Sequence, residues 1–315
     1  MIAGNMLQQA YNLADTWVVG RFIGSDALAA AGLSFALITF LNSIVIGLSM
    51  GSSVVFSVSI GSQDEKRLKS ALGASFAITA GMALILCLLS LVLLKPLMVW
   101  LNTPAELNDM TAAYLRVILC GIPAVGIYNF FAAYLRSKGD SETPLIFLAL
   151  SSALNIALDL LFVIVFKMGI EGAAIATLIA EVLSAAAIAG YSLHSDSVLK
   201  TGLWPLKTDR QALAEIADYS FLTCLQQSVM NLGILMVQGI VNGFGPTVMA
   251  AFAAGVKIDA FAYMPAQEYG NAFSTFAAQN RGGKTEQPHD GWIQSCCAHF
   301  AWLLPDRFAD PLVSC

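Results

Sequence analysis

Polar positions along the chain are few, and long apolar runs separate them. Each run is long enough to cross about 30 Å of hydrocarbon as a helix. Residues 1–20 are predicted to form a further helix that contains several polar residues. Few residues precede it, so we expect this first helix to lack its N-terminal part. The runs predict seven spans, at 33–60, 68–94, 112–135, 144–166, 170–193, 212–243 and 247–280. The pattern therefore predicts an all-α polytopic membrane protein with about eight helices present.

Composition supports a chain surrounded by lipid. Hydrophobic residues make up 57% of the sequence and charged residues 12%, about half the charged fraction of an ordinary soluble domain. The net charge of −5 is small and spread out, so we expect a lipid bilayer around the chain and no nucleic-acid partner. Nucleophile triads, CxxC pairs and phosphate-binding loops are absent from the sequence, and we expect neither enzymatic activity nor an organic cofactor.

Basic residues gather in alternate connections between the spans. The loops after the second, fourth, sixth and eighth helices hold ten of them: Lys66, Arg67, Lys69, Arg136, Lys138, Lys200, Lys207, Arg210, Arg281 and Lys284. The other loops hold three, at Arg21, Lys95 and Lys167. The positive-inside rule then predicts a cytoplasmic N-terminus in a bacterial-type inner membrane.

The start of the chain is repeated about 220 residues later. Leu7-Gln8-Gln9 recurs as Leu225-Gln226-Gln227. The similarity between the two copies continues as far as Gly61 and Gly282, and the offset between matching positions increases from 218 to 221 residues. The period contains six helices, so both copies cross the membrane in the same direction and are related by an axis along its normal. We expect an N-lobe at 1–195, a cytoplasmic inter-lobe loop at 196–211 and a partial C-lobe at 212–286.

The end of the chain does not continue this pattern. Two full copies predict a whole protein of roughly 440 residues, whereas residues 287–315 contain no spanning apolar run. We expect a frame-shifted or truncated end, with a short amphipathic or disordered tail as the alternative. A truncated product without transport activity is therefore one hypothesis.

Ionisable residues inside the spans are functional candidates, because each costs roughly 2.5–3.5 kcal/mol at a helix centre. Counting 1.5 Å per residue along each helix places Asp15, Asp159 and Thr177 at a similar depth. Asn155 precedes Asp159 by one turn. We expect Asp15, Asn155, Asp159 and Thr177 to form one site, which holds either a monovalent cation such as Na⁺ or a shared proton. The alternatives are that Asp15 caps its helix and that Asp159 is an isolated core acid.

A second set of polar residues is expected to support this site or to line a substrate cleft. Tyr11 lies one turn before Asp15 in the sequence, and Glu181 lies one turn after Thr177. The set consists of Tyr11, Gln8, Glu181 and Lys257. For Glu181 and Lys257, packing or pairing without a transport role is the alternative.

Small residues and proline predict where helices approach closely or bend. Gly47 and Gly51 have the GxxxG spacing that lets two helix backbones come together. Pro123, flanked by Gly121 and Gly126, should kink or loosen the fourth helix.

The run from Leu7 to Ala30, with Asp15-Thr16 followed by Gly20 and Ala29-Ala30, resembles the multidrug and toxic compound extrusion (MATE) family. So does the segment AQNRGGKTE at the end of the eighth helix. The resemblance implies twelve helices in two six-helix lobes around a central cleft. It also implies a monomer that exchanges Na⁺ or H⁺ for cationic, often aromatic compounds by rocker-switch alternating access.

The same resemblance implies roles for individual residues. Asp15 is similar to the first-helix carboxylate of the family, Asn155 and Asp159 to an Asn-x-x-x-Asp pair in the fifth helix, and Thr177 to a sixth-helix hydroxyl of the DinF-like branch. Gln226 and Gln227 stand where the NorM-like branch has a seventh-helix carboxylate, which puts an Na⁺ site in the C-lobe in doubt. A lipid-linked oligosaccharide flippase of the same superfamily is the rival reading, and it would need a cationic cleft.

Overall fold

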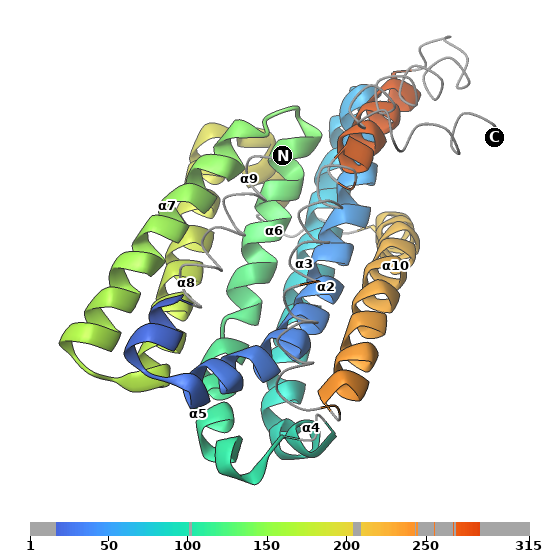
Figure 1. Cartoon of the computed structure of the whole chain (residues 1–315). Helices are drawn as coiled ribbons and strands as arrows, with labels where there is room; N and C mark the ends of the chain where they lie inside the picture. Colours follow the sequence, from blue (N-terminus) through green and yellow to red (C-terminus); the bar gives the residue numbers. More distant parts are fainter. Residues whose placement is uncertain are drawn as a thin grey trace, which may run out of the picture.

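The computed structural model describes residues 17–100, 103–203, 209–242 and 269–283, together with positions 244, 255 and 267. Within these ranges the chain is helical and contains no strand, which confirms the predicted all-α class (Figure 1). Residues 17–22 and 269–282 are also helical. The elements between them are α2 (Ser25–Gly61), α3 (Glu65–Val92), α4 (Leu94–Trp100), η1 (Ala105–Leu107), α5 (Asn108–Leu119), α6 (Ile122–Ser137), α7 (Glu142–Asp159), η2 (Leu160–Val165), α8 (Gly169–Ser195), α9 (Ser197–Leu203) and α10 (Arg210–Asn242).

Five segments of the described chain are long and apolar enough to cross a membrane. They are Asp26–Gly61, Glu65–Val92, Asn108–Ser137, Glu142–Val165 and Gly169–Ser195, in the order that the apolar pattern predicts. The protein is therefore a multi-pass membrane protein. One element was not expected: the short helix α9 lies in the segment 196–211, which we had predicted to be a loop.

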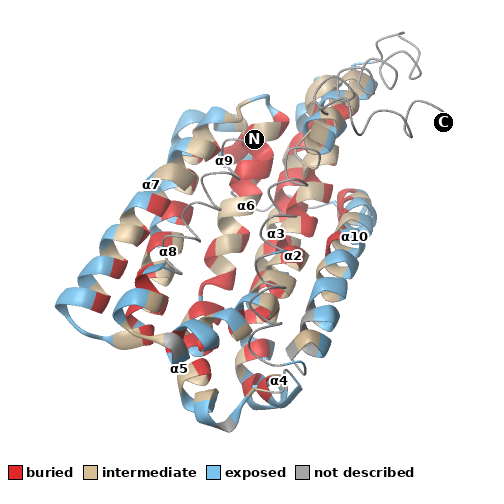
Figure 2. Cartoon of the chain, viewed as in Figure 1, coloured by how far each residue is buried: buried red, intermediate tan, exposed pale blue. Residues whose placement is uncertain are grey.

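The segment Asn108–Ser137, third of the five, is the most enclosed. In its most apolar window 61% of the residues are buried, against 22% in Glu142–Val165. The outer faces of α7 and α10 are exposed (Figure 2), and α8 also has exposed residues on one face. Those faces are rich in apolar residues such as Leu150 on α7 and Leu183 on α8, as expected for surfaces that contact lipid.

One end of the bundle carries many of the basic loop residues, among them Lys66, Arg67, Arg136 and Lys138, and we call it the basic end. Near this end, α2, α3 and α6 are joined by edge-to-face aromatic pairs. Phe130 of α6 lies 6.1 Å from Phe56 of α2 and 5.3 Å from Phe76 of α3, measured between ring centroids. These aromatic side chains belong to one apolar cluster, which packs α2, α3 and α6 together near the basic end.

The span Asn108–Ser137 is broken into α5 and α6 at Cys120 and Gly121. Pro123 has no backbone N–H, so the carbonyl of Leu119 cannot receive the bond that a helix would provide. The amides of Cys120 and Gly121 instead donate to carbonyls three residues earlier, over 3.1 and 2.9 Å. The predicted kink is confirmed as a break at this point.

Helices α2 and α10 touch backbone to backbone. A methyl group added at Gly47 would lie 2.5 Å from Cα of Cys224, and one added at Gly51 would lie 2.4 Å from Cα of Ser220. Since carbon atoms normally stay about 3.5–4.0 Å apart, glycine is required at both positions. The close approach predicted for the GxxxG pair is confirmed, and α10 is the partner.

Hydroxyl groups hold this contact together. Ser75 of α3 donates to Ser52 of α2 over 2.7 Å, and Ser52 lies 3.5 Å from the hydroxyl of Ser220 on α10. Thr223 of α10 donates to the carbonyl of Gly47 over 2.7 Å. In lipid such bonds replace the hydrophobic driving force between helices.

One glutamine of the repeated LQQ frame packs at the same contact. Gln227 is buried and donates to Sδ of Met50 on α2 over 3.6 Å, whereas Leu225 and Gln226 are exposed. In the second copy, the frame therefore directs Gln227 toward α2.

Candidate functional site

The structure brings Asn155, Asp159 and Thr177 together between α7 and α8. Asn155 and Asp159 lie one turn apart at the end of α7, and Thr177 lies on α8. Asp159 is 0% exposed and Asn155 is 2% exposed, in a span whose outward residues are apolar. A carboxylate at such a position is costly unless it is compensated.

Asn155 connects the other two side chains. With its amide nitrogen turned to Asp159, it donates to Oδ2 over 3.0 Å. Its amide oxygen then accepts from the backbone N–H of Thr177 over 3.1 Å and lies 3.2 Å from Oγ1 of Thr177. The neighbours of Asn155 assign this orientation of the amide, because it matches each donor with an acceptor. The three residues form one hydrogen-bonded unit.

Local backbone structure allows this unit to form. The helix changes to π geometry over η2, directly after Asp159, a feature often found at functional sites. A methyl group added at Gly172 of α8 would lie 3.2 Å from Cβ of Phe162, so glycine lets η2 approach α8 closely. The Thr177 hydroxyl is also placed 3.1 Å from the carbonyl of Ala173, one turn earlier.

The described end of the first helix packs beside this unit. Val18 and Val19 are buried in a cluster with Val163 of η2 and with Ala173 and Ala174 of α8. The other predicted site residues, Asp15, Tyr11, Gln8 and Lys257, lie outside the described residues.

Glu181 lies elsewhere on α8, against the break between α5 and α6. Its Oε2 atom is buried and has no hydrogen-bond partner among the described residues. A methyl group added at Gly121 would lie 2.1 Å from this oxygen. Glu181 makes none of the three ion pairs of the described chain. A second buried carboxyl group is thus packed against the break between α5 and α6.

The oxygen atoms of Asn155, Asp159 and Thr177 suit a small hard cation or a proton. Carboxylate, amide and hydroxyl oxygens are the ligands that hard cations prefer over nitrogen or sulfur. A buried carboxyl group beside a hydrogen-bond donor can also exchange a proton. The arrangement can therefore alternate between a charged and a neutralised state.

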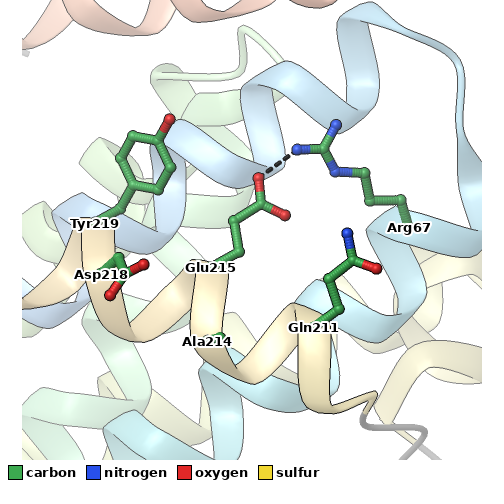
Figure 3. A pocket seen from close by; sticks show the side chains of 6 residues that line it. All are labelled: Arg67, Gln211, Ala214, Glu215, Asp218 and Tyr219. Atoms are coloured by element: carbon green, nitrogen blue, oxygen red, sulfur yellow. Dashed lines mark hydrogen bonds and ion pairs between the residues drawn. The ribbon is translucent and has the colours of Figure 1, made fainter.

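A hollow in the described part of the chain lies away from this unit, between α3 and α10. It has a volume of about 520 Å³, and Arg67, Gln211, Glu215 and Tyr219 are among the residues that line it (Figure 3). Arg67 forms an ion pair with Glu215 across the hollow. Asp64 accepts the amide of Arg67 over 3.0 Å and so caps the start of α3. This hollow belongs to the contact between the helices rather than to the buried acids.

The sequence predicted that Asn155, Asp159 and Thr177 come together, but it did not predict the contact of Glu181 with Gly121. The i, i+4 spacing of Asn155 and Asp159 and the depth of Thr177 were readable from the chain. The position of Glu181 against Gly121 was not predicted, although Gly121 beside Pro123 signalled a break at that level. The pairing of Arg67 with Glu215 carried no local signal, because the two residues are 148 positions apart.

Known proteins resemble this chain in sequence and in fold. The MatE family model matches residues 1–161. The probable multidrug resistance protein YpnP of Bacillus subtilis is 30% identical over 286 residues, and the match covers 90% of this chain and 63% of YpnP. The probable multidrug resistance protein NorM of Thermotoga maritima is 29% identical over 322 residues, with 98% of this chain and 68% of NorM covered.

A solved structure shows the same fold. It is an outward-facing multidrug resistance MATE family transporter, which superposes with a TM-score of 0.83 at 23% identity and covers 96% of this chain and 66% of its own. The chain thus spans about two thirds of the length of the relatives that it matches.

Proposed function

The chain belongs to the MATE family, and from this premise we propose that it carries the N-lobe and part of the C-lobe of a cation-coupled antiporter. The proposed lobes are 1–195 and 212–286, joined by the segment 196–211. The exported compounds are cationic or aromatic drugs and toxic molecules, and either H⁺ or Na⁺ moves inward in exchange. Two observations support this: multidrug resistance proteins are among the relatives, and a buried polar unit stands in an apolar span.

The observation that carries the proposal is the buried unit of Asn155, Asp159 and Thr177. In this proposal Asp159 takes up a proton or contributes a ligand to Na⁺, and Asn155 orients it. Asp15 supplies a further carboxylate, since it precedes the packed residue Val18 by three positions in the sequence. Tyr11, Gln8, Glu181 and Lys257 support this site or line the substrate cleft.

Neutralisation of the site supplies the coupling. A carboxylate that loses its cation regains a full charge, which the protein interior solvates poorly. The bundle then has to rearrange to let water reach the charge, and the lobes rock from one access state to the other. A flippase for lipid-linked oligosaccharides is less favoured, because its pyrophosphate requires basic groups, whereas Asp159 and Oε2 of Glu181 are buried and no Lys or Arg is buried among the described residues.

Ethidium efflux from proteoliposomes tests the proposal. The 315-residue chain should export ethidium under a proton gradient or an Na⁺ gradient, applied separately. Asp159→Asn and Asp15→Asn should each lower the rate by about tenfold or more, in the range of mutations that remove a proton-transfer group. Glu171→Gln, which changes an exposed carboxylate on α8, is the matched control and should leave the rate unchanged.

Each possible result is informative. An Asp159→Asn chain that exports ethidium at the normal rate would remove Asp159 from the coupling. Efflux under a proton gradient without Na⁺ would assign H⁺, and a strict Na⁺ requirement would assign Na⁺. A folded chain that exports nothing under either gradient would contradict the proposed activity for this chain.

A further inference from the structure

Two helix ends meet at the basic end of the bundle through glycine. The last turn of α2 crosses the helix at 269–282, which lies beside it in Figure 1. A methyl group added at Gly61 would lie 2.0 Å from the carbonyl oxygen of Gln279. One added at Gly282 would lie 2.1 Å from the carbonyl oxygen of Val58. We call the contact of residues 58–62 with residues 279–283 the glycine crossing.

The glycine crossing is reciprocal. Gly282 is the repeat counterpart of Gly61, and Gln279 is that of Val58, each at an offset of 221 residues. Gly61 meets Gln279 while Gly282 meets Val58, so the two copies of one segment contact each other through the same positions. A contact of this kind lies on the two-fold axis that relates the copies.

Its position on that axis gives the contact a consequence for transport. In a parallel repeat the axis runs along the membrane normal between the lobes. A pathway between the lobes surrounds the same axis, so backbones that touch on the axis close it at their level. The contacting segments are the end of the span Asp26–Gly61 and the end of the helix at 269–282, and both lie at the basic end, the side that the basic residues predict to be cytoplasmic.

Polar contacts around the crossing reinforce the closed arrangement. Gln279 donates through Nε2 to the carbonyl of Ser137 on α6 over 2.5 Å. The ion pair of Arg67 with Glu215 joins α3 to α10 beside it, and the Arg67 side chain is 38% exposed. A hollow of about 300 Å³ borders the crossing and includes Arg67, Glu215 and Gly282 in its lining. Contacts that are partly exposed to water can break without unfolding a packed core.

We propose that the glycine crossing is the seal of the transport pathway at the basic end, closed in this structure and opened when the lobes rock apart. This rests on the alternating access of the proposed function. The absence of side chains at Gly61 and Gly282 serves both states: the backbones close tightly, and they separate without withdrawing a side chain from a packed pocket. Any larger residue at either position holds the seal open.

Spin-label distances test the state of the seal directly. Labels at Lys66 and Arg281, both exposed, report the separation of the two helix ends in a cysteine-free form of the 315-residue chain in lipid. Double electron–electron resonance should show mainly short distances in the parent chain. Gly61→Ala and Gly282→Ala should each lower the ratio of short to long distances about tenfold.

Control substitutions separate this effect from a general disturbance. Gly81→Ala and Gly190→Ala add a methyl group where no atom lies within 4 Å, and both should keep the parental distances. A second label pair at Glu142 and His194, both exposed and both within the N-lobe, should be unchanged in every variant that is folded. Ethidium efflux by the unlabelled variants is measured in parallel, and it should fall about tenfold in Gly61→Ala and Gly282→Ala.

The outcomes distinguish the seal from the proposed function. Parental distances in Gly61→Ala and Gly282→Ala would overturn the seal, and so would normal efflux by variants that show long distances. If the parent chain itself exports no ethidium, the proposed function fails, and with it the role of the crossing as a seal. The distances then still decide whether the two glycines hold the helix ends together.

Discussion

Replacing Gly121 by alanine should destabilise the protein through a direct clash with Glu181. The added methyl group would lie 2.1 Å from Oε2 of Glu181 and 3.1 Å from the carbonyl oxygen of Ile118. Carbon and oxygen normally approach to about 3.3 Å, so the carboxyl group has to move by about 1 Å inside a packed interior. Forcing an extra methyl group into such a site costs about 1–3 kcal/mol.

A double-mutant cycle assigns this cost to the carboxyl group. We expect Gly121→Ala to lower the free energy of unfolding in mixed micelles titrated with SDS by about 1–3 kcal/mol. In a Glu181→Ala background, Gly121→Ala should lower the free energy of unfolding much less, with a coupling energy between the two substitutions of about 0.5–2 kcal/mol. Gly190→Ala, on the same helix as Glu181 and with no atom within 4 Å of the added methyl group, is the control and should be neutral.

Additive effects of Gly121→Ala and Glu181→Ala on the free energy of unfolding would contradict the proposed clash. A coupling energy below about 0.3 kcal/mol is what independent sites give. It would mean that the carboxyl group does not rest on Gly121, and that the break between α5 and α6 is shaped by Pro123 alone. A large cost of Gly121→Ala that persists without Glu181 would point instead to the carbonyl of Ile118.

Two further changes test other contacts. Gly51→Ala should lower the stability by about 1–3 kcal/mol in thermal unfolding, because its methyl group would lie 2.4 Å from Cα of Ser220; an unchanged transition would contradict the α2–α10 contact. Burial opposes ionisation of Asp196, but hydrogen bonds from Lys138, Tyr134 and the Val198 amide outweigh it and hold the pKa of Asp196 below its usual 3.8. A carboxylate with a lowered pKa in the folded state stabilises the protein above its unfolded pKa, and this stabilisation is lost as the pH falls through the folded value. Asp196→Asn should therefore lower the stability at neutral pH and weaken its acid dependence below about pH 3.8, measured by unfolding at several pH values; an unaltered acid dependence would refute it.

Sequence patterns predicted the parts of the fold that depend on local rules. The apolar runs located the spans because a helix in lipid has to satisfy its own backbone. Gly47 and Gly51 predicted a close helix contact, and Pro123 predicted the break, because each acts on the backbone through its own covalent structure. Asn155 and Asp159 could be placed on one face since four residues make about one turn.

The remaining features depend on how each helix is rotated about its own axis. Nothing near Gly51 in the sequence identifies Ser220 as its partner, and nothing near Glu181 directs it to Gly121. Packing of the whole bundle fixes those rotations. The π geometry of η2 after Asp159 could not be predicted either, because the apolar sequence of Leu160–Val165 is equally typical of an ordinary α-helix.

The hydroxyl contact of α2, α3 and α10 also has a consequence for the order of assembly. Ser52 and Ser75 are 23 residues apart, whereas Ser52 and Ser220 are 168 apart. At 5–20 residues per second, translation needs roughly 10–30 s to cover the longer interval. During that delay the face of α2 that will receive α10 does not yet have this partner. The Ser52 hydroxyl donates to the carbonyl of Leu48 in its own helix over 2.9 Å and accepts from Ser75, so this polar group already has two partners in α2 and α3 before α10 is made.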